Sequence, residues 1–250
     1  MIIQSFASSG KPVGFAHHIR NAAALVAVGG LLATGCTTTP HTLPPMSKTQ
    51  QLAITPGKAL ERLEVGNARF VAGKTEHHDW QQQRAATAAG QYPFAVLLSC
   101  IDSRVSSEII FDQGFGDIFN VRVAGNVLDE DVLGSLEFAC QVAGAKLIAV
   151  VGHSHCGAVK GACSGAQFGH LTGLLDKIQP SVAEVKEKLP GVAPTDGNFI
   201  KEVAELNVHH VLHQIRQQSP VLRELIDSGR LGLVGGVYDL DSGKVQFFNR

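Results

Sequence analysis

Two apolar runs of this chain end in side chains that bind metals, and this repeated arrangement limits the possible folds more than any other feature. The first run covers residues 94–99 and is followed at once by Cys100. The second covers residues 147–152 and is followed by His153 and, shortly after, Cys156. Apolar runs of this length are typical of buried strands. Neighbouring parallel strands would bring both ends to one edge of a sheet, where open α/β proteins place their chemistry.

Helix and strand patterns alternate along the rest of the chain. Strand patterns cover residues 117–125, 231–240 and 244–248, and the last two read as a hairpin. Helix signals, either apolar residues at helical spacing or capping residues, cover residues 55–71, 79–89, 131–142, 171–189, 199–217 and 220–227. This order predicts an α/β fold with a mostly parallel central β-sheet flanked by helices and an antiparallel edge strand.

The composition favours one large globular domain that acts on a small molecule. Of the 250 residues, 44% are hydrophobic and 17% are charged, which is enough apolar material for a proper core. The formal net charge is -1 and no run of Lys or Arg occurs, so the chain lacks the electrostatic footprint of a nucleic-acid-binding protein. Five cysteines are too few for a disulfide scaffold, and their position near histidines favours metal binding.

The beginning of the chain has the features of an export signal. Lys11 and Arg20 precede an apolar stretch, residues 22–33, which has the length of a signal-peptide core and is short for a bilayer span. The sequence Leu-Ala-Thr-Gly-Cys then resembles the cleavage box of bacterial lipoproteins, in which the cysteine is lipidated and becomes the new N-terminus. Cys36 is therefore the expected lipidation site. The alternative is an apolar N-terminal helix that buries Cys36.

These features divide the chain into three parts. Residues 1–36 are the predicted export signal of the lipoprotein type, and residues 37–54, which begin in a Thr- and Pro-rich stretch, are a predicted flexible linker. Residues 55–250 form the predicted catalytic domain. A chain of this kind would be exported to the periplasm and held at the membrane by its lipid.

The ends of the two apolar runs supply the ligands that zinc prefers. Cys100, His153 and Cys156 offer two thiolates and an imidazole for a tetrahedral site, and three protein ligands leave the fourth position to solvent or to Asp102. An open fourth position is typical of catalytic zinc. The alternative is a closed structural site in which Asp102 is the fourth ligand and the metal only holds loops together.

Arg104, two residues after Asp102, helps to decide between an open catalytic site and a closed structural site. A guanidinium in that place can bind the carboxylate bidentately and hold it away from the metal. Zinc lowers the pKa of a bound water to about 7, so hydroxide would be available at neutral pH. An ionised Asp102 would then accept a hydrogen bond from that hydroxide and orient it. The alternative is a purely structural ion pair at a strand end.

Three segments of the sequence resemble the signature segments of the β-class carbonic anhydrases. They are Cys-Ile-Asp-Ser-Arg-Val at residues 100–105, Arg-Val-Ala-Gly-Asn at 122–126 and Gly-His-Ser-His-Cys-Gly-Ala at 152–158. The similarity extends from about Thr55 to the C-terminus. It implies one zinc ion per subunit, bound by the two cysteines and the histidine, and a lyase that hydrates carbon dioxide reversibly to bicarbonate and a proton. It also implies a homodimer or homotetramer with active sites near the subunit interface.

The resemblance further implies a set of residues around the substrate. Gln91 corresponds to a pocket glutamine that can come from the neighbouring subunit, and Phe119 to a pocket aromatic residue. Phe138 stands where many members have Tyr, and Ala124 where Val is common in the pocket wall. Gly157 completes the implied substrate pocket.

Two departures from the family pattern bear on Asp102. Members that bind bicarbonate in an inhibitory pocket and move this Asp onto zinc tend to have Trp at the position of Leu97 and Gly at that of Ser99. We therefore expect Asp102 to be held by Arg104 at neutral or higher pH, and to be a metal ligand only if the site closes as the pH falls.

Two rival functions share parts of this pattern. A hydrolase of the same fold that acts on carbonyl sulfide or carbon disulfide would use every ligand, and only its pocket would differ. A non-enzymatic, zinc-stabilised module would keep a closed coordination shell at every pH. His155 lies beside the ligands and is a candidate proton shuttle, a role that needs hydrogen-bond or one-water reach.

Overall fold

The computed structural model describes residues 43–248, so the predicted export signal and Cys36 lie outside the described residues. The described part contains a five-stranded sheet in the order β2-β1-β3-β4-β5. The strands are β1 (Ala95–Ser99), β2 (Ile118–Arg122), β3 (Leu147–His153), β4 (Gly232–Tyr238) and β5 (Val245–Phe248). Only β5 runs antiparallel to its neighbour. The predicted α/β fold with one antiparallel edge strand is therefore confirmed.

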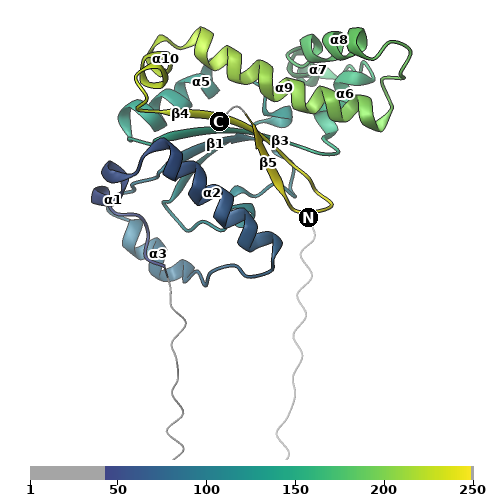
Figure 1. Ribbon diagram of the computed structural model, residues 1–250. Helices are drawn as coiled ribbons and strands as arrows, with labels where there is room; N and C mark the ends of the chain where they lie inside the picture. The colour runs from purple at the N-terminus through teal and green to yellow at the C-terminus, as the bar shows by residue number, and fades with distance from the viewer. Residues whose placement is uncertain (1–42, 249–250) are drawn as a thin grey trace, which may run out of the picture. The chain divides into compact units, whose positions relative to one another are not determined.

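Helices cover both faces of this sheet. They are α1 (Lys48–Ala53), α2 (Pro56–Val71), α3 (Trp80–Thr87), α4 (Ser107–Ile110), α5 (Glu130–Glu137), α6 (Gly157–Cys163), α7 (Gly169–Asp176), α8 (Gln179–Lys188), α9 (Gly197–Gln218) and α10 (Pro220–Asp227). Figure 1 shows α2 and α3 on one side of the sheet and α5, α9 and α10 on the other. No helix within residues 43–248 is both long and apolar enough to cross a membrane.

Two of the predicted helices are interrupted in the structure. The helix predicted over residues 131–142 is α5 followed by a π-helical turn, η2 (Phe138–Val142). The helix predicted over residues 171–189 is two helices, α7 and α8, and Pro180 lies in the first turn of α8. Proline lacks an N–H and is tolerated at the start of a helix but not inside it, so a new helix begins there.

The central strand β1 shows why its sequence is an uninterrupted apolar run. Ala95 and Leu97 pack in a core cluster that includes side chains of α2, whereas Val96 and Leu98 pack in a second cluster that includes side chains of α5 and α9. All four are fully buried. A strand covered on both faces has no solvent side, so its sequence does not alternate between apolar and polar residues.

A third apolar cluster encloses the carboxyl ends of β1 and β3. It contains Cys100 and Cys156 together with side chains of α6, α8 and α9, among them Val159, Val185 and Phe199. The residues expected to bind a metal are therefore surrounded by apolar side chains. Electrostatic interactions are stronger in such surroundings than in water.

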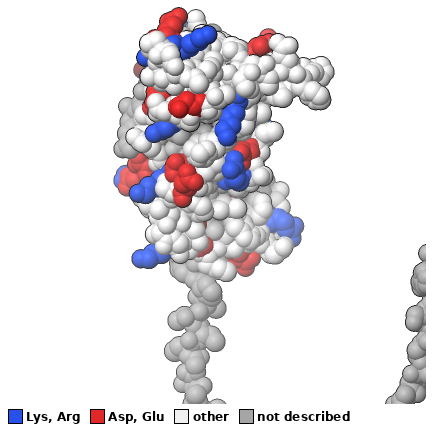
Figure 2. Space-filling view, turned by 90° about the vertical axis from the view of Figure 1, so that its right-hand side faces the viewer, with Lys and Arg blue, Asp and Glu red and all other residues white. Residues whose placement is uncertain are grey.

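Charged side chains on the outside are mixed in sign. Figure 2 shows Lys and Arg side chains interspersed with Asp and Glu over one face, with white areas between them and no continuous field of either sign. This distribution agrees with the formal net charge of -1.

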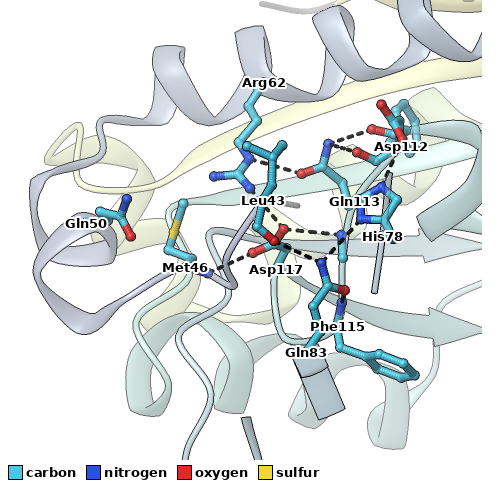
Figure 3. Close-up of polar contacts among 12 residues, drawn as sticks. Leu43, Met46, Gln50, Arg62, His78, Gln83, Asp112, Gln113, Phe115 and Asp117 are labelled. Carbon is cyan, nitrogen blue, oxygen red and sulfur yellow. Dashed lines mark hydrogen bonds and ion pairs between the residues drawn. The ribbon is translucent and has the colours of Figure 1, made fainter. Parts of the chain in front are cut away.

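The structure differs from the predicted flexible linker, residues 37–54, over the part of it that is described. The backbone N–H of Met46 donates to Asp117 Oδ1 at 3.0 Å, and the carbonyl of Leu43 accepts from Gln83 Nε2 at 3.1 Å (Figure 3). The Met46 side chain is buried. These contacts hold the chain against the domain from Leu43 onward.

Helix α1 fixes the rest of this segment. Ser47 and Gln50 form a reciprocal capping box at its start. Gln51 is buried, and its Nε2 donates to the carbonyls of Pro93 and Ala143 at 2.8 Å each. The Thr and Pro residues predict a flexible segment. In the structure, hydrogen bonds to the domain fix residues 43–54 instead, and composition alone does not reveal such bonds.

Candidate metal centre

Three side chains from separate elements meet at the carboxyl edge of the sheet. Cys100 follows β1, His153 ends β3, and Cys156 directly precedes α6. Their ligand atoms all lie within 4.8 Å of one another, and all three residues are buried. Strands β1 and β3 are parallel neighbours, which brings their ends together. The prediction that the two strand ends meet is therefore confirmed.

The imidazole of His153 is oriented for metal binding. Its Nδ1 lies 2.9 Å from the carbonyl oxygen of Ser154. A carbonyl only accepts, so Nδ1 carries the proton and Nε2 keeps its lone pair. Nε2 is buried and makes no hydrogen bond with any described residue. A buried polar atom without a partner costs about 1–3 kcal/mol, and a metal ion shared with the two sulfurs would remove this penalty.

The two thiols behave as a pair. A hydrogen bond with Cys156 lowers the pKa of Cys100, and the same bond, together with burial, raises the pKa of Cys156. The hydrogen bond thus favours the thiolate form of Cys100, in the apolar surroundings of the third cluster. Zinc binds thiolates and releases thiol protons, so the donor set of two sulfurs and one imidazole nitrogen fits a zinc ion.

Asp102 is bound to Arg104 beside this cluster. Arg104 Nε donates to Asp102 Oδ1 at 2.9 Å, Arg104 Nη2 donates to Oδ2 at 2.8 Å, and the backbone N–H of Arg104 donates to Oδ1 at 2.9 Å. These bonds hold the pKa of Asp102 well below its usual range. Asp102 Oδ2 lies 4.0 Å from His153 Nε2, outside the three-residue cluster. The geometry is the one expected for an open site, and metal ligation by Asp102 at low pH stays a prediction.

Arg122 is the first residue of the family-like segment 122–126, and the sequence predicted no separate role for it. Its Nε donates to the carbonyl of Cys100 at 2.9 Å, and its Nη2 donates to the carbonyl of Asp102 at 2.6 Å. Arg122 ends β2, whose register with β1 pairs it with Ser99. Its position at the end of a strand that neighbours β1 was the sequence feature that could have predicted a contact with the Cys100 turn. The guanidinium holds the turn that carries both a ligand and the carboxylate.

The residues expected around the substrate are distributed over two places. Phe119 and Phe138 meet edge to face, with ring centroids 6.4 Å apart, in a groove of about 620 Å³ between β2 and α5. This groove includes Arg122 but none of the three ligand residues. Gln91 is exposed in the loop between α3 and β1. The structure of one chain does not bring these residues to the cluster, so their pocket roles stay predictions.

Two other expected pocket residues lie beside the ligands. Ala124 begins the short helix η1 (Ala124–Asn126), whose Gly125 N–H donates to Cys100 Sγ at 3.4 Å. Gly157 follows Cys156, and the space where its side chain would project is open. His155 is exposed, and its Nε2 lies 3.4 Å from Asp241 Oδ2. The imidazole is thus engaged with the turn between β4 and β5, and a role in proton transfer remains untested.

Replacing one ligand is expected to remove the metal without unfolding the chain. Cys156→Ser should lower zinc affinity at least tenfold, because a hydroxyl is a far weaker ligand than a thiolate. Zinc content after dialysis against a chelator, measured by mass spectrometry, checks this. Cys140→Ser is the matched control. Cys140 is also buried, but it packs in the second core cluster, with side chains of α5 and α9, away from the ligands. Equal zinc retention by Cys156→Ser and the wild type would contradict the assignment.

Comparisons with known proteins agree with this geometry. A sequence model of the carbonic anhydrase family matches residues 95–245. Carbonic anhydrase 2 of Mycobacterium tuberculosis is 41% identical over 195 residues, which cover 76% of this chain and 91% of that protein. A carbonic anhydrase of Mycolicibacterium smegmatis is 36% identical over 197 residues, which cover 76% of this chain and 92% of that protein.

Solved structures give the same result at the level of the fold. A structure from a study of two tetrameric β-carbonic anhydrases of Sordaria macrospora matches with a TM-score of 0.60 and 27% identity, covering 65% of this chain and 84% of that chain. The β-carbonic anhydrase of Coccomyxa matches with a TM-score of 0.58 and 23% identity, covering 76% of this chain and 81% of that chain. The chain described here therefore belongs to the β-class carbonic anhydrase family.

Proposed function

We propose that this chain is a zinc-dependent lyase that hydrates carbon dioxide reversibly to bicarbonate and a proton. The observation that carries the proposal is the buried cluster of Cys100, His153 and Cys156, in which His153 Nε2 has no hydrogen-bond partner among the described residues. An ionised carboxylate, Asp102, lies beside this cluster and is held by Arg104. The family assignment supports the same reaction.

The three ligand residues would hold the zinc ion, one per subunit. Bound there, zinc would act as a Lewis acid that lowers the pKa of a coordinated water to about 7. A site with three protein ligands keeps a fourth position open, as this chemistry requires. The apolar side chains around Cys100 and Cys156 would strengthen the electrostatic interactions within the site.

Asp102 would serve as a fixed hydrogen-bond acceptor. Arg104 keeps the pKa of Asp102 low, so Asp102 stays ionised over the working pH range and can accept a hydrogen bond from the reactant water. The ion pair also fixes the orientation of the carboxylate, because Arg104 donates to both of its oxygens. Arg122 holds the backbone of the same turn by donating to the carbonyls of Cys100 and Asp102. The three groups together would orient the nucleophile toward the carbon of a small, uncharged substrate.

A hydrolase acting on carbonyl sulfide or carbon disulfide is the second candidate that the ligand set alone allows. No feature of the described residues favours it, and the relatives reported above are named carbonic anhydrases. Assays with those two substrates beside carbon dioxide separate the two functions. A non-enzymatic zinc module is less consistent with an Asp102 that is held away from the cluster by Arg104.

Stopped-flow measurement of carbon dioxide hydration, from about pH 5 to about pH 9, tests the proposal and the role of the ion pair. The wild type should accelerate hydration, and Cys100→Ser should lose the acceleration with its zinc. In Arg104→Gln the carboxylate of Asp102 loses its bidentate partner and is no longer held in one orientation, so kcat/KM should fall at every pH of this range. The ordinary pKa of Asp, about 3.9, lies below the range, so the loss comes from orientation and not from protonation. An Arg104→Gln profile identical to the wild type would contradict the orienting role of Asp102.

We also propose that the chain assembles as a homodimer or homotetramer through the open edge of the sheet. Among the described residues β2 pairs only with β1, and the groove beside it exposes Phe138, which is 53% accessible. The Sordaria proteins that this chain resembles are called tetrameric. Phe138→Asp should shift the mass in analytical ultracentrifugation toward a monomer. Phe168→Asp is the control. This phenylalanine precedes α7, away from the sheet edge, and is 80% exposed, so its replacement should leave the mass unchanged. A monomeric wild type would contradict the proposal.

The sequence supports export and lipidation at Cys36, and we propose that the mature protein is anchored in the periplasm by this lipid. Leu43 is hydrogen bonded to Gln83 of the domain, and six residues separate it from Cys36, a reach of about 20 Å when extended. Expression in a bacterial host with labelled palmitate should label the wild type but not Cys36→Ser. An unlabelled wild type, or a mature protein that still carries residues 1–35, would contradict lipidation.

A further inference from the structure

A buried asparagine of α9 contacts the turn that hydrogen bonds the Cys100 sulfur. Asn207 is 2% exposed, and its Nδ2 donates to the carbonyl of Gly125 at 2.9 Å. The N–H of the same Gly125 donates to Cys100 Sγ at 3.4 Å. One glycine therefore connects an amide in a helix far along the chain with a sulfur of the metal cluster.

The conformation of this turn depends on its surroundings. Gly125 has φ 68° and Asn126 has φ 44°, so two consecutive residues are left-handed and one of them is not glycine. A Cβ on Gly125 would approach Ile178 Cδ1 to 2.8 Å and Ala158 Cβ to 3.2 Å. The turn is thus packed closely against α6 and the start of α8, and it persists because contacts hold it in place.

We propose that Asn207 is a positioning residue for the metal ligand. By holding the Gly125 carbonyl, it keeps the Gly125 N–H on the Cys100 sulfur. A hydrogen bond to a thiolate stabilises its negative charge and reduces the electron density that the sulfur donates to a metal ion. Asn207 thereby tunes the donor strength of Cys100 without touching the metal or the substrate. The inference rests on the metal site of the proposed function, but not on its reaction.

A purely structural role for Asn207 would have different consequences. In that case the amide would only fasten α9 to the turn, and its loss would lower stability without changing the sulfur. Asn67 provides the comparison, because it is 6% exposed and its Nδ2 also donates to backbone carbonyls, those of Ile110 and Gly243. Asn67 lies in α2, on the other side of the sheet from α9. It reproduces the structural role without the link to Cys100.

Cobalt(II) in place of zinc tests the inference, because its sulfur-to-metal charge-transfer band reports on the thiolates. In Asn207→Ala this band should move to lower energy, since a sulfur that has lost its hydrogen bond is a stronger donor. Affinity for zinc, measured by competition with a chelator, should fall about 10-fold to 100-fold, because the turn no longer holds the Cys100 sulfur in place and this loss outweighs the greater donor strength of the sulfur. In Asn67→Ala both quantities should match the wild type, while thermal unfolding shows a loss of stability, since Asn67 also accepts a hydrogen bond from the Val245 N–H.

The outcome that would overturn the inference is an Asn207→Ala protein with an unchanged cobalt band and zinc affinity, in which only the stability is lowered. If Asn207→Ala does not fold, Asn207→Leu, which is similar in size and has no hydrogen-bond donor, is measured in the same way. An unshifted band in that folded variant, with wild-type zinc affinity, counts equally against the inference. Absence of carbon dioxide hydration by the wild type would refute the proposed reaction, yet the cobalt measurement would still decide the role of Asn207.

Discussion

The parallel pairing of β1 with β3 is the interaction on which the site depends. Their register places Ser99 opposite Val151, so the residues that follow each strand emerge at the same edge. Both strands are buried on both faces, and the apolar clusters on either side leave them little freedom to slide. A shift by one residue would turn buried side chains to the wrong face, so the packing also fixes the positions of the ligands.

Negative charge accumulates at this edge, and the chain compensates it with donors from several elements. Two sulfurs and the carboxylate of Asp102 lie around His153. Arg104 neutralises the carboxylate, and Arg122 binds the carbonyls of the turn between it and Cys100. Unpaired charges in apolar surroundings would be very unfavourable. These donors therefore compensate the carboxylate and the turn, but not the two sulfurs. A cation bound between the sulfurs and the imidazole would compensate those.

Sequence reasoning predicted the parts of this structure that depend on local patterns. The apolar runs before Cys100 and His153 predicted two buried strands, and parallel pairing then placed the ligands together. The bidentate contact of Arg104 with Asp102 also follows from residues two positions apart. The break between α7 and α8 was not predicted, because the apolar periodicity continues across it and only Pro180 marks the start of the new helix.

Other features depend on contacts between distant segments, which no local pattern encodes. Asn207 lies in an ordinary amphipathic helix, and only the folded chain shows that its amide meets the carbonyl of Gly125. Phe119 and Phe138 were expected near the metal from family likeness, yet within one chain they line a separate groove. Residues that complete the pocket of a second subunit would show this arrangement, and contacts between subunits leave no pattern within one sequence.

The buried Gln51 has a consequence for where this domain begins. Its amide joins the backbone just before β1 to the backbone at the end of η2, just before β3, and so braces the amino ends of the two strands whose other ends carry the ligands. A shortened chain starting at the predicted boundary, Thr55, would lack that brace and the Met46 contact. The smallest autonomous unit is therefore longer than the catalytic motifs suggest, and proteolytic removal of residues 43–54 would lower its stability.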